Sequence, residues 1–479
     1  MIINFFSFYF LIFLLNIIPF TINYIILPFK TYIDKPGEDP KKGINTTLFF
    51  ENYFSNKIYS SIEIGNPKKV IPIEITSSSY GLIIGYLCDK NYNKDISQYN
   101  NNSSKTFFRE YDGLITFQQY EGGYYGKDSF TFLTDLKDQN NEITINNISF
   151  IYMPKTSKSE LIKSSNKICG ILGLSLKYYN YCEEQRNLIT NLNKLNIIHN
   201  YAYSIHYKDD NNGFIIIGEE PHNVISDKFD EDILRRTNAL SDGYDSVEWK
   251  TEFTQIYFYD NGEKKKLTET KRVKFAIEIN YMIGTNNYKK NMENYFFGNY
   301  LEQNICHYEK IQNKRYSILI CDDVPSFDID SFPSIFLYHR IFNYTFELTK
   351  DELFLKKDNK YIFLVFFSDY DIKYYVLGKI FLKKYLLVFN QDTKSIGFYN
   401  NELKMLKNEK YNILYIIIVT ILTIICSIIG FYLAKKIYEN NRRTRINEIN
   451  EQYEYKSNEK NINDESNDKN KILLEMPSK

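Results

Sequence analysis

One segment near the C-terminus restricts what the rest of the chain can fold into. Residues 413–433 are 21 consecutive positions that are almost all apolar, from Ile413 to Leu433. A helix rises about 1.5 Å per residue, so a helix of this length crosses the roughly 30 Å hydrocarbon core of a bilayer. The sequence therefore predicts one membrane-spanning helix, and it leaves the residues before that helix to form the folded part of the protein.

Basic side chains follow the apolar segment at once and indicate its orientation. They are Lys435, Lys436, Arg442, Arg443 and Arg445. Lysine and arginine concentrate on the cytosolic side of membrane helices. We therefore predict a single-pass type I membrane protein of the secretory pathway, with its ectodomain in the lumen or outside the cell. The tail, residues 434–479, is rich in Asn, Glu and Lys and is predicted to be cytosolic and disordered.

Two further features fit a secretory route. Residues 1–23 form an apolar segment that is similar to a signal peptide, although it has no basic residue at its start and no clear cleavage site. Acceptor sequences for N-glycosylation all precede the membrane segment, which predicts a glycoprotein. They begin at Asn45, Asn101, Asn102, Asn147 and Asn343.

Charge and motif content exclude several function classes. The chain has 59 basic and 59 acidic side chains, so it lacks the basic surplus that nucleic-acid binding requires. Its five histidines show no metal-ligand spacing, and no phosphate-binding glycine loop or nucleophile elbow is present. We therefore expect no nucleic acid, no metal and no cofactor.

The residues before the membrane segment have the pattern of β-strands. Tyr, Phe, Ile and Thr recur in short alternating runs such as 129–134 and 360–367, and Asn, Asp and Gly separate these runs. No long amphipathic helical period competes with them. The pattern predicts an all-β fold.

Six short motifs occur in a fixed order between residues 55 and 400. Among them are Tyr-Ser-Ser-Ile-Glu-Ile-Gly-Asn-Pro at 59–67, Ile-Thr-Ser-Ser-Ser at 75–79, Cys-Gly-Ile-Leu-Gly-Leu-Ser at 169–175 and Val-Leu-Gly-Lys-Ile-Phe-Leu-Lys-Lys-Tyr at 376–385. This series resembles the pepsin-like aspartic proteases, in which the second motif is Asp-Thr-Gly-Ser-Ser. With its C-terminal helix the chain is similar to the membrane-anchored branch of that family, which includes β-secretase and the plasmepsin of the endoplasmic reticulum.

The resemblance implies a bilobal pepsin-like fold with lobes at 50–225 and 226–402. It also implies a mobile flap hairpin at Tyr120, Gly122 and Gly123, whose glycines would permit the turn. Cys306 and Cys321 fall where the family carries a disulfide in the second lobe. Cys169 and Cys182 are candidates for another disulfide, and this pairing leaves Cys88 without a partner.

Both catalytic aspartates of the family are missing on this alignment. Ile75 stands at the first position and Ile279, in the sequence Ala-Ile-Glu-Ile-Asn-Tyr at 276–281, stands at the second. In the resembled enzymes the two carboxylates share a proton and act as acid and base, which isoleucine cannot do. Glu74 and Glu278 are the only acids near enough to replace them. Strand alternation predicts that each glutamate points away from the dyad position.

Three functions remain open at this point. The preferred interpretation is a catalytically inactive, aspartic-protease-like protein that binds an extended peptide or protein between its lobes. The first alternative is an active aspartic endopeptidase that uses Glu74 and Glu278. The second is a structural or adhesive surface protein that uses the lobes as a rigid scaffold. The mutual placement of residues 75 and 279 is the observation that separates them.

Overall fold

The structure is a computed structural model in which two compact units, divided after Lys404, are described separately. The described residues are 23–31, 57–85, 99–117, 120–136, 141–153, 169–176, 187–240, 248–268, 272–311, 316–370, 372, 374–400 and 409–472. All but the last residue of the predicted signal segment at 1–23 lies outside these ranges, as do Asn45, Cys88 and Cys182.

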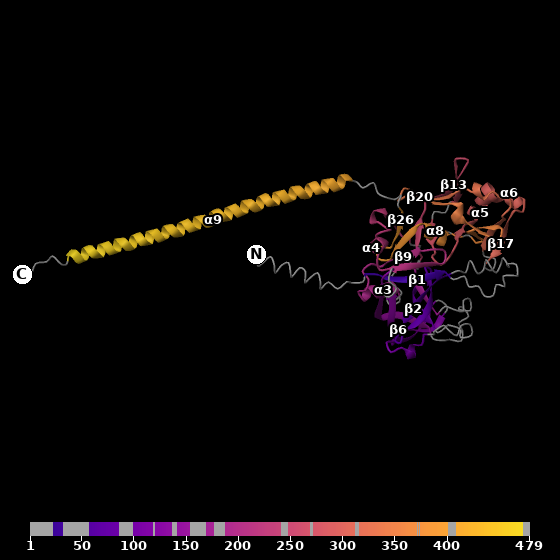
Figure 1. Ribbon diagram of the computed structural model, residues 1–479, viewed down its shortest axis with the longest axis horizontal. Coiled ribbons are helices and arrows are strands. Elements are labelled where there is room, and N and C mark those ends of the chain that lie inside the picture. Colours follow the sequence, from indigo (N-terminus) through magenta and orange to yellow (C-terminus); the bar gives the residue numbers. More distant parts are fainter. Residues whose placement is uncertain are drawn as a thin grey trace, which may run out of the picture. The chain divides into compact units, whose positions relative to one another are not determined.

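The largest sheet of the first unit joins strands from both halves of the chain (Figure 1). Within the described residues it has 13 strands, and the pairing of β25 with β9, in which Val388 lies opposite Ser204, connects the two predicted lobes. In spatial order the strands are β11 (Leu234–Asn238), β26 (Ser395–Tyr399), β25 (Leu386–Asn390), β9 (Ala202–Tyr207), β10 (Asn212–Ile217), β1 (Ile25–Thr31), β2 (Ile58–Ile64), β3 (Lys69–Thr76), β8 (Gly170–Leu174), β4 (Tyr80–Gly85), β7 (Glu142–Met153), β6 (Tyr120–Leu133) and β5 (Phe108–Phe117).

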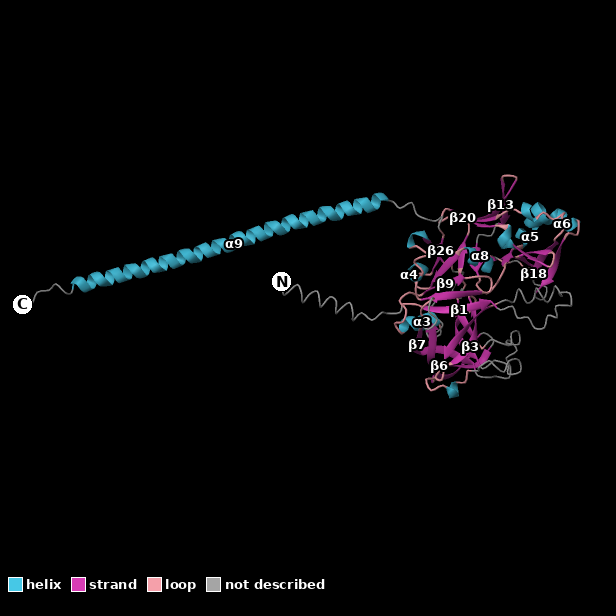
Figure 2. Cartoon of the chain, in the orientation of Figure 1, coloured by secondary structure: helices cyan, strands magenta, loops and turns pink. Residues whose placement is uncertain are grey.

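Two smaller sheets build the second lobe (Figure 2). One runs through β12 (Lys250–Glu252), β15 (Arg272–Phe275), β24 (Tyr375–Leu377), β16 (Met282–Gly284), β23 (Val365–Ser368), β18 (Tyr316–Asp322), β22 (Lys360–Phe363) and β21 (Phe354–Lys357), and β17 (Cys306–Ile311) pairs with β18. The other contains β14 (Glu263–Thr268), β13 (Gln255–Asp260), β19 (Ile335–His339) and β20 (Tyr344–Leu348).

Helices in the first unit are short and connect the strands. The α-helices are α3 (Leu188–Lys194), α4 (Pro221–Val224), α5 (Asn286–Met292), α6 (Gly298–Glu302), α7 (Lys350–Leu353) and α8 (Lys379–Lys384). Single turns of other helix types are η1 (Asn101–Ser103), η3 (Glu231–Ile233), η4 (Glu293–Phe297, a π-helix) and η5 (Ile329–Ser331). The all-β character predicted from the alternating runs is confirmed.

Alternation along the strands explains why they pair. In β2 the side chains of Ile58, Ser60, Ile62 and Ile64 are buried, while those between them are partly or fully exposed. Each fully buried isoleucine contributes about 1.5–3 kcal/mol relative to an exposed one. Strands with one apolar face therefore gain most when that face covers a core. Isoleucine and phenylalanine supply much of the main core cluster.

The two lobes contain the same arrangement of three strands. In the first lobe β3 runs parallel to β8, and β8 runs antiparallel to β4, so that Leu172 lies opposite both Ile75 and Leu82. In the second lobe β15 is parallel to β24 and β24 is antiparallel to β16, so that Leu377 lies opposite both Phe275 and Met282. The prediction of a fold with two related lobes is confirmed.

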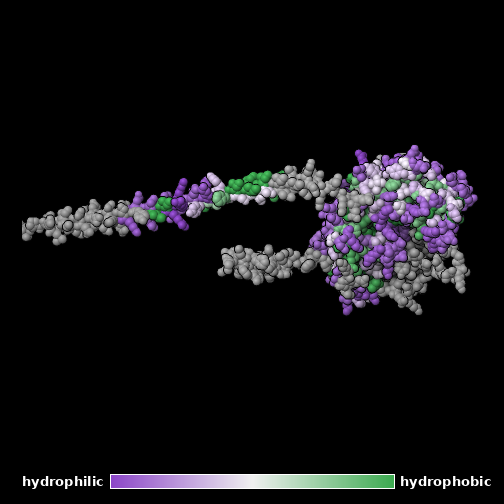
Figure 3. Space-filling view, turned by 45° about the horizontal axis from the view of Figure 1, so that its top comes forward, coloured by the Kyte–Doolittle hydropathy of each residue, from purple (hydrophilic) through white to green (hydrophobic). Residues whose placement is uncertain are grey.

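The second unit is a single helix, α9 (Glu409–Ile472). Within the described residues it is the one helix long and apolar enough to cross a membrane, with the candidate span at Ile418–Gln452. Figure 3 shows the largest hydrophobic group of α9 in one stretch, followed by mostly hydrophilic residues with a smaller hydrophobic group among them. The predicted disordered tail differs from the structure, in which the helix continues to Ile472. Glu, Lys, Arg and Gln favour helix, and extending a formed helix needs no new nucleus.

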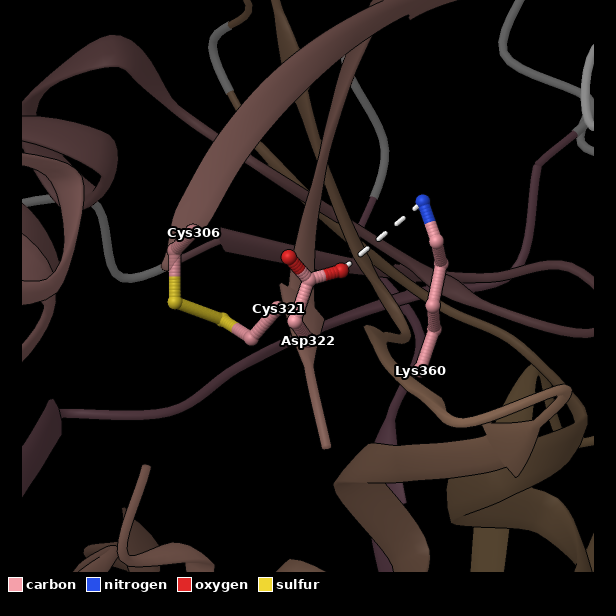
Figure 4. The surroundings of a disulfide bond; sticks show 4 residues. All are labelled: Cys306, Cys321, Asp322 and Lys360. Carbon is pink, nitrogen blue, oxygen red and sulfur yellow. Dashed lines mark ion pairs between the residues drawn. A yellow bond between two sulfur atoms is a disulfide. The ribbon is translucent and has the colours of Figure 1, made fainter. Parts of the chain in front are cut away.

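The predicted disulfide between Cys306 and Cys321 is present. The two cysteines lie directly opposite one another on β17 and β18, beside the ion pair between Asp322 and Lys360 (Figure 4). Cys169 is disulfide-bonded as well. Within the described residues Cys426 of α9 is a free, exposed cysteine.

Candidate functional site

The two lobes meet at Ser77, the first residue after β3. Its hydroxyl donates a hydrogen bond to Glu278 Oε2 at 2.7 Å, and its backbone N–H donates a second to the same oxygen at 3.1 Å. The hydroxyl also accepts a hydrogen bond from the Ile277 N–H at 3.3 Å and lies 3.5 Å from the Phe275 carbonyl oxygen. Ser77 of the first lobe therefore contacts three residues of the second lobe, Phe275, Ile277 and Glu278.

Local geometry explains why this segment can reach across. Strand β15 ends at Phe275, and residues 277 and 278 lie in a turn before β16 begins at Met282. Strand alternation therefore does not apply to Glu278, whose partly exposed side chain points to the first lobe. The prediction that it faces away assumed a strand through residue 279 and is wrong for this residue.

Ile75 and Ile279, the two predicted dyad positions, are not equivalent in the structure. Ile75 is completely buried in the main core cluster. Its partner Leu172 has the same place in the first lobe as Leu377, the partner of Phe275, has in the second, so Ile75 is equivalent to Phe275. Ile279 is partly buried against a different cluster in the second lobe. The strand register therefore corrects the assumption that the Ile-Glu-Ile triplets at 73–75 and 277–279 match one another. Period-two alternation repeats isoleucine in both segments, and only the partner strand fixes the register.

Tyr281 also lies away from the contact between the lobes. Its ring stacks on Phe366 with centroids 3.8 Å apart, and it is 3% exposed within the second-lobe cluster. Gly378 is packed beneath this segment, since a Cβ there would come within 2.3 Å of the Tyr281 carbonyl oxygen and 2.5 Å of that of Ile279. A glycine is required at that position.

The structure does not bring Glu74 and Glu278 together. Glu74 forms an ion pair with Lys57 at 2.7 Å, whereas Glu278 bonds to Ser77. The two glutamates therefore do not form the close pair of carboxylates that a catalytic dyad needs in order to share one water. No group of three His, Cys, Asp or Glu side chains arranged to hold a metal ion occurs in the described part of the chain.

Burial and charge around Glu278 affect two tyrosines of β9. Burial raises the pKa of Tyr203 and of Tyr207, and the negative charge of Glu278 raises both further. Tyr203 donates its hydroxyl to the Leu174 carbonyl oxygen at 2.7 Å, and the Trp249 indole N–H donates to the same oxygen at 2.9 Å. Beneath the contact, therefore, aromatic side chains from both halves of the chain converge on the end of β8.

The predicted flap hairpin is formed by β5 and β6, but its turn precedes Tyr120. Gly123 lies within β6 opposite Ile115, and Tyr120 lies opposite Phe117, so these glycines belong to a strand of the hairpin. Gly122 is also part of this strand. A Cβ at Gly123 would come within 2.5 Å of Met153 Sδ. Gly123 thus lies close to β7, and the prediction of a turn at these glycines is wrong.

A completely buried aspartate anchors the base of this hairpin. Asp128 of β6 accepts hydrogen bonds from Tyr99 at 2.7 Å, Ser104 at 3.2 Å and Thr106 at 2.5 Å, and from the Ser129 N–H at 2.8 Å. Four donors satisfy the buried charge, which would otherwise be costly. Through these contacts Asp128 joins β6 to the loop at 99–106.

Ser77 is the residue that the sequence argument missed. The hydroxyl residues at 76–79 are visible in the sequence, but an alignment that places Ile75 at the aspartate position gives Ser77 no role. Moving the family motif forward by one position in the first lobe places Thr76-Ser77-Ser78-Ser79 against Asp-Thr-Gly-Ser, and moving it back by three positions in the second lobe places Ala276-Ile277-Glu278 against Asp-Thr-Gly. On this alignment Ser77 stands in the place of the family's threonine in the first lobe, and neither lobe supplies an aspartate.

Comparison with known proteins agrees with this geometry. The family model for "Eukaryotic aspartyl protease" matches residues 57–401. Conglutin gamma, a basic 7S globulin from lupine seeds, is a similar solved structure with a TM-score of 0.55 and 14% sequence identity, and the match covers 79% of this chain and 95% of that chain. At this identity the likeness shows the fold alone. The comparison with curated proteins found no match.

Proposed function

Because this chain belongs to the eukaryotic aspartyl protease family, we propose that it is a membrane-anchored protein that binds an extended peptide or protein segment and does not hydrolyse it. The observation that carries this proposal is the composition of the two segments that meet between the lobes. Residues 69–79 and 272–285 contain no aspartate. The absence holds for both alignments of the family motif, so it does not depend on the choice of register.

A single carboxylate cannot replace a catalytic pair in which one group acts as acid and the other as base. Glu278 is the only acid of the contact that Ser77 makes with the second lobe. In the family's mechanism one carboxyl group acts as base while the other acts as acid, and the loss of a general acid or base alone costs roughly 10²–10⁴ in rate. Glu74, the second acid considered, is held by Lys57. These contacts favour an inactive protein over an endopeptidase that uses the two glutamates.

Peptide binding is the function that the remaining architecture supports best. The lobes are joined by a continuous sheet, and the β5–β6 hairpin is anchored through Asp128. Extended peptides bind proteins through strand-like backbone hydrogen bonds, and these require no catalytic residue. A protein that served only as a structural scaffold would not need a place where a peptide can form these hydrogen bonds.

Membrane topology completes the proposal. The exposed apolar stretch of α9 supports a single-pass anchor, and the basic residues from Lys435 to Arg445 support a cytosolic C-terminus. The disulfide between Cys306 and Cys321 fits an ectodomain in an oxidising compartment.

The test uses the full chain purified in detergent micelles. A fluorogenic peptide library is incubated with it from acid to neutral pH, with and without pepstatin, and an immobilised sample is used to capture a random decapeptide library. We expect no pepstatin-sensitive cleavage and specific retention of peptides. Pepstatin-sensitive cleavage would refute the inactive assignment, whereas the absence of both cleavage and retention would leave the scaffold as the better function.

A further inference from the structure

The carboxylate of Glu278 is satisfied on one oxygen only. Oε2 accepts both hydrogen bonds from Ser77, and within the described residues Oε1 has no hydrogen-bond partner. No described Lys, Arg or His side chain forms an ion pair with Glu278 either. The other glutamate of the predicted pair shows the contrast, because Glu74 has Lys57 at 2.7 Å.

The lysine next to this segment in space is committed elsewhere. Lys379 donates its backbone N–H to the Ile279 carbonyl oxygen at 2.8 Å, yet its ammonium group donates to the Asp210 carbonyl oxygen. Asp210 also forms an ion pair with Lys383 at 2.7 Å. Asp210 thus binds two lysines of α8, and the third, Lys384, pairs with Glu352, so no lysine of α8 compensates the charge of Glu278.

The negative charge of Glu278 affects a nearby buried tyrosine. It raises the pKa of Tyr207, after the larger effect of burial, and the Tyr207 hydroxyl is buried without a hydrogen-bond partner in the described structure. An uncompensated carboxylate in partly desolvated surroundings interacts with a cation more strongly than one in open water does. Glu278 remains partly exposed, so part of its side chain is open to a ligand from solvent.

We propose that Glu278 is the recognition residue for a positively charged group of the bound peptide, a lysine or arginine side chain, which it binds through Oε1 while Ser77 holds Oε2. The proposal rests on the proposed peptide-binding function and names the class of its ligand. Ser78 follows Ser77 and is exposed. Its hydroxyl, 2.8 Å from that of Thr76, is a further acceptor for an ammonium or guanidinium group.

The test compares two decapeptide pools that differ only at one central residue, which is lysine in one pool and Nε-acetyl-lysine in the other. Acetylation removes the charge and keeps the length of the stem. Affinity for the full chain in detergent micelles is measured by fluorescence anisotropy at neutral pH. We expect the lysine pool to bind about fivefold more tightly, the size of effect typical of a partly exposed charge pair.

Two variants locate the preference. In Glu278→Gln the ratio of the two affinities should fall to about one, whereas Glu74→Gln, which removes the carboxylate paired with Lys57, should keep the fivefold ratio. Equal affinities in the unsubstituted protein, or a preference that survives Glu278→Gln, would overturn the proposal. Equal binding of both pools leaves peptide binding itself intact, whereas failure of both pools to bind overturns the proposed function together with this inference. Because the unsubstituted protein is compared with two ligands, the outcome does not depend on the folding of a variant.

Discussion

Ser77 of the first lobe and Glu278 of the second are joined by two hydrogen bonds to one carboxylate oxygen, at 2.7 Å and 3.1 Å. A buried hydroxyl that donates to a charged acceptor contributes about 1.5–3 kcal/mol. We expect Ser77→Ala to lower the free energy of unfolding by about 2 kcal/mol. Urea denaturation of the full chain followed by tryptophan fluorescence measures the change. Ser78→Ala is the control, since this exposed neighbour bonds only to Thr76, and equal losses for the two variants would contradict the prediction.

A second prediction concerns the restoration of aspartates. Ile75 is completely buried and lies opposite Leu172 in the core, so Ile75→Asp should destabilise the first lobe by more than about 3 kcal/mol. We expect the double variant Ile75→Asp with Ile279→Asp to show no pepstatin-sensitive cleavage. Thr76→Asp with Ala276→Asp, which adjoin Ser77 and Ile277, should melt at a higher temperature than that pair. The reverse order of melting temperatures would argue against the strand register.

The third prediction tests the anchor of the hairpin. Asp128→Asn replaces an acceptor of four hydrogen bonds by an amide that presents hydrogens to the same donors. Stability should fall by about 3 kcal/mol because buried donors lose their partner. Asp227→Asn, at an exposed aspartate, should change it by less than about 0.5 kcal/mol. Thermal unfolding monitored by circular dichroism distinguishes the two, and a mild effect at Asp128 would show that the loop at 99–106 does not depend on it.

The fourth prediction is a loss of stability in acid. Both ring nitrogens of His339 are buried without a partner, and burial lowers the pKa of this histidine from 6.5 to about 4. Below pH 6.5 the unfolded chain takes up a proton that the folded protein does not, so stability falls as the pH drops from about 6.5 to 4. This one group accounts for a loss of up to about 3 kcal/mol. His339→Phe, beside Phe342, should flatten the pH dependence of the melting temperature.

Retention of the full acid loss in His339→Phe would assign it to other groups. One of them is His206, whose pKa burial lowers to about 3. Its ring lies 2.8 Å from the Ser204 hydroxyl and stacks on Phe214, so His206→Phe is the matched comparison.

The fifth prediction concerns the disulfide. Cys306 and Cys321 are 15 residues apart, and closing a loop of that length stabilises a protein by about 3 kcal/mol. Cys306→Ala with Cys321→Ala should lower the free energy of unfolding by that amount. Maleimide labelling of intact microsomes should leave both cysteines of the unsubstituted protein unmodified until a reductant is added. Labelling without reductant would show that the bond does not form in the cell.

The sequence predicted features that depend on local pattern. Alternation in β2 and the 21 apolar residues at 413–433 each specify an element without reference to distant residues. The position of the dyad could not be predicted from local pattern. Isoleucine recurs at every second residue in 73–75 and in 277–279, so alternation alone allows more than one alignment. Leu172 and Leu377, on strands far away in the chain, decide between them.

The direction of Glu278 also lay beyond a sequence argument. A strand was assumed through residue 279, but β15 ends at Phe275 and the turn that follows sends the side chain to Ser77. The tail after residue 433 shows the opposite error. Its composition resembles that of disordered segments, yet it continues a helix that the apolar residues before it have already nucleated.

The pairing of β25 with β9 has a consequence for how the protein is made and divided. Residues 386–390 complete a sheet whose neighbouring strand, 202–207, is synthesised far earlier, so that strand keeps an open edge until residue 390 has been synthesised. An open edge is a template for pairing with other chains. We therefore expect a chain that stops at residue 225 to aggregate instead of folding as an independent half, and a chain that stops before residue 386 to keep the edge of β9 open.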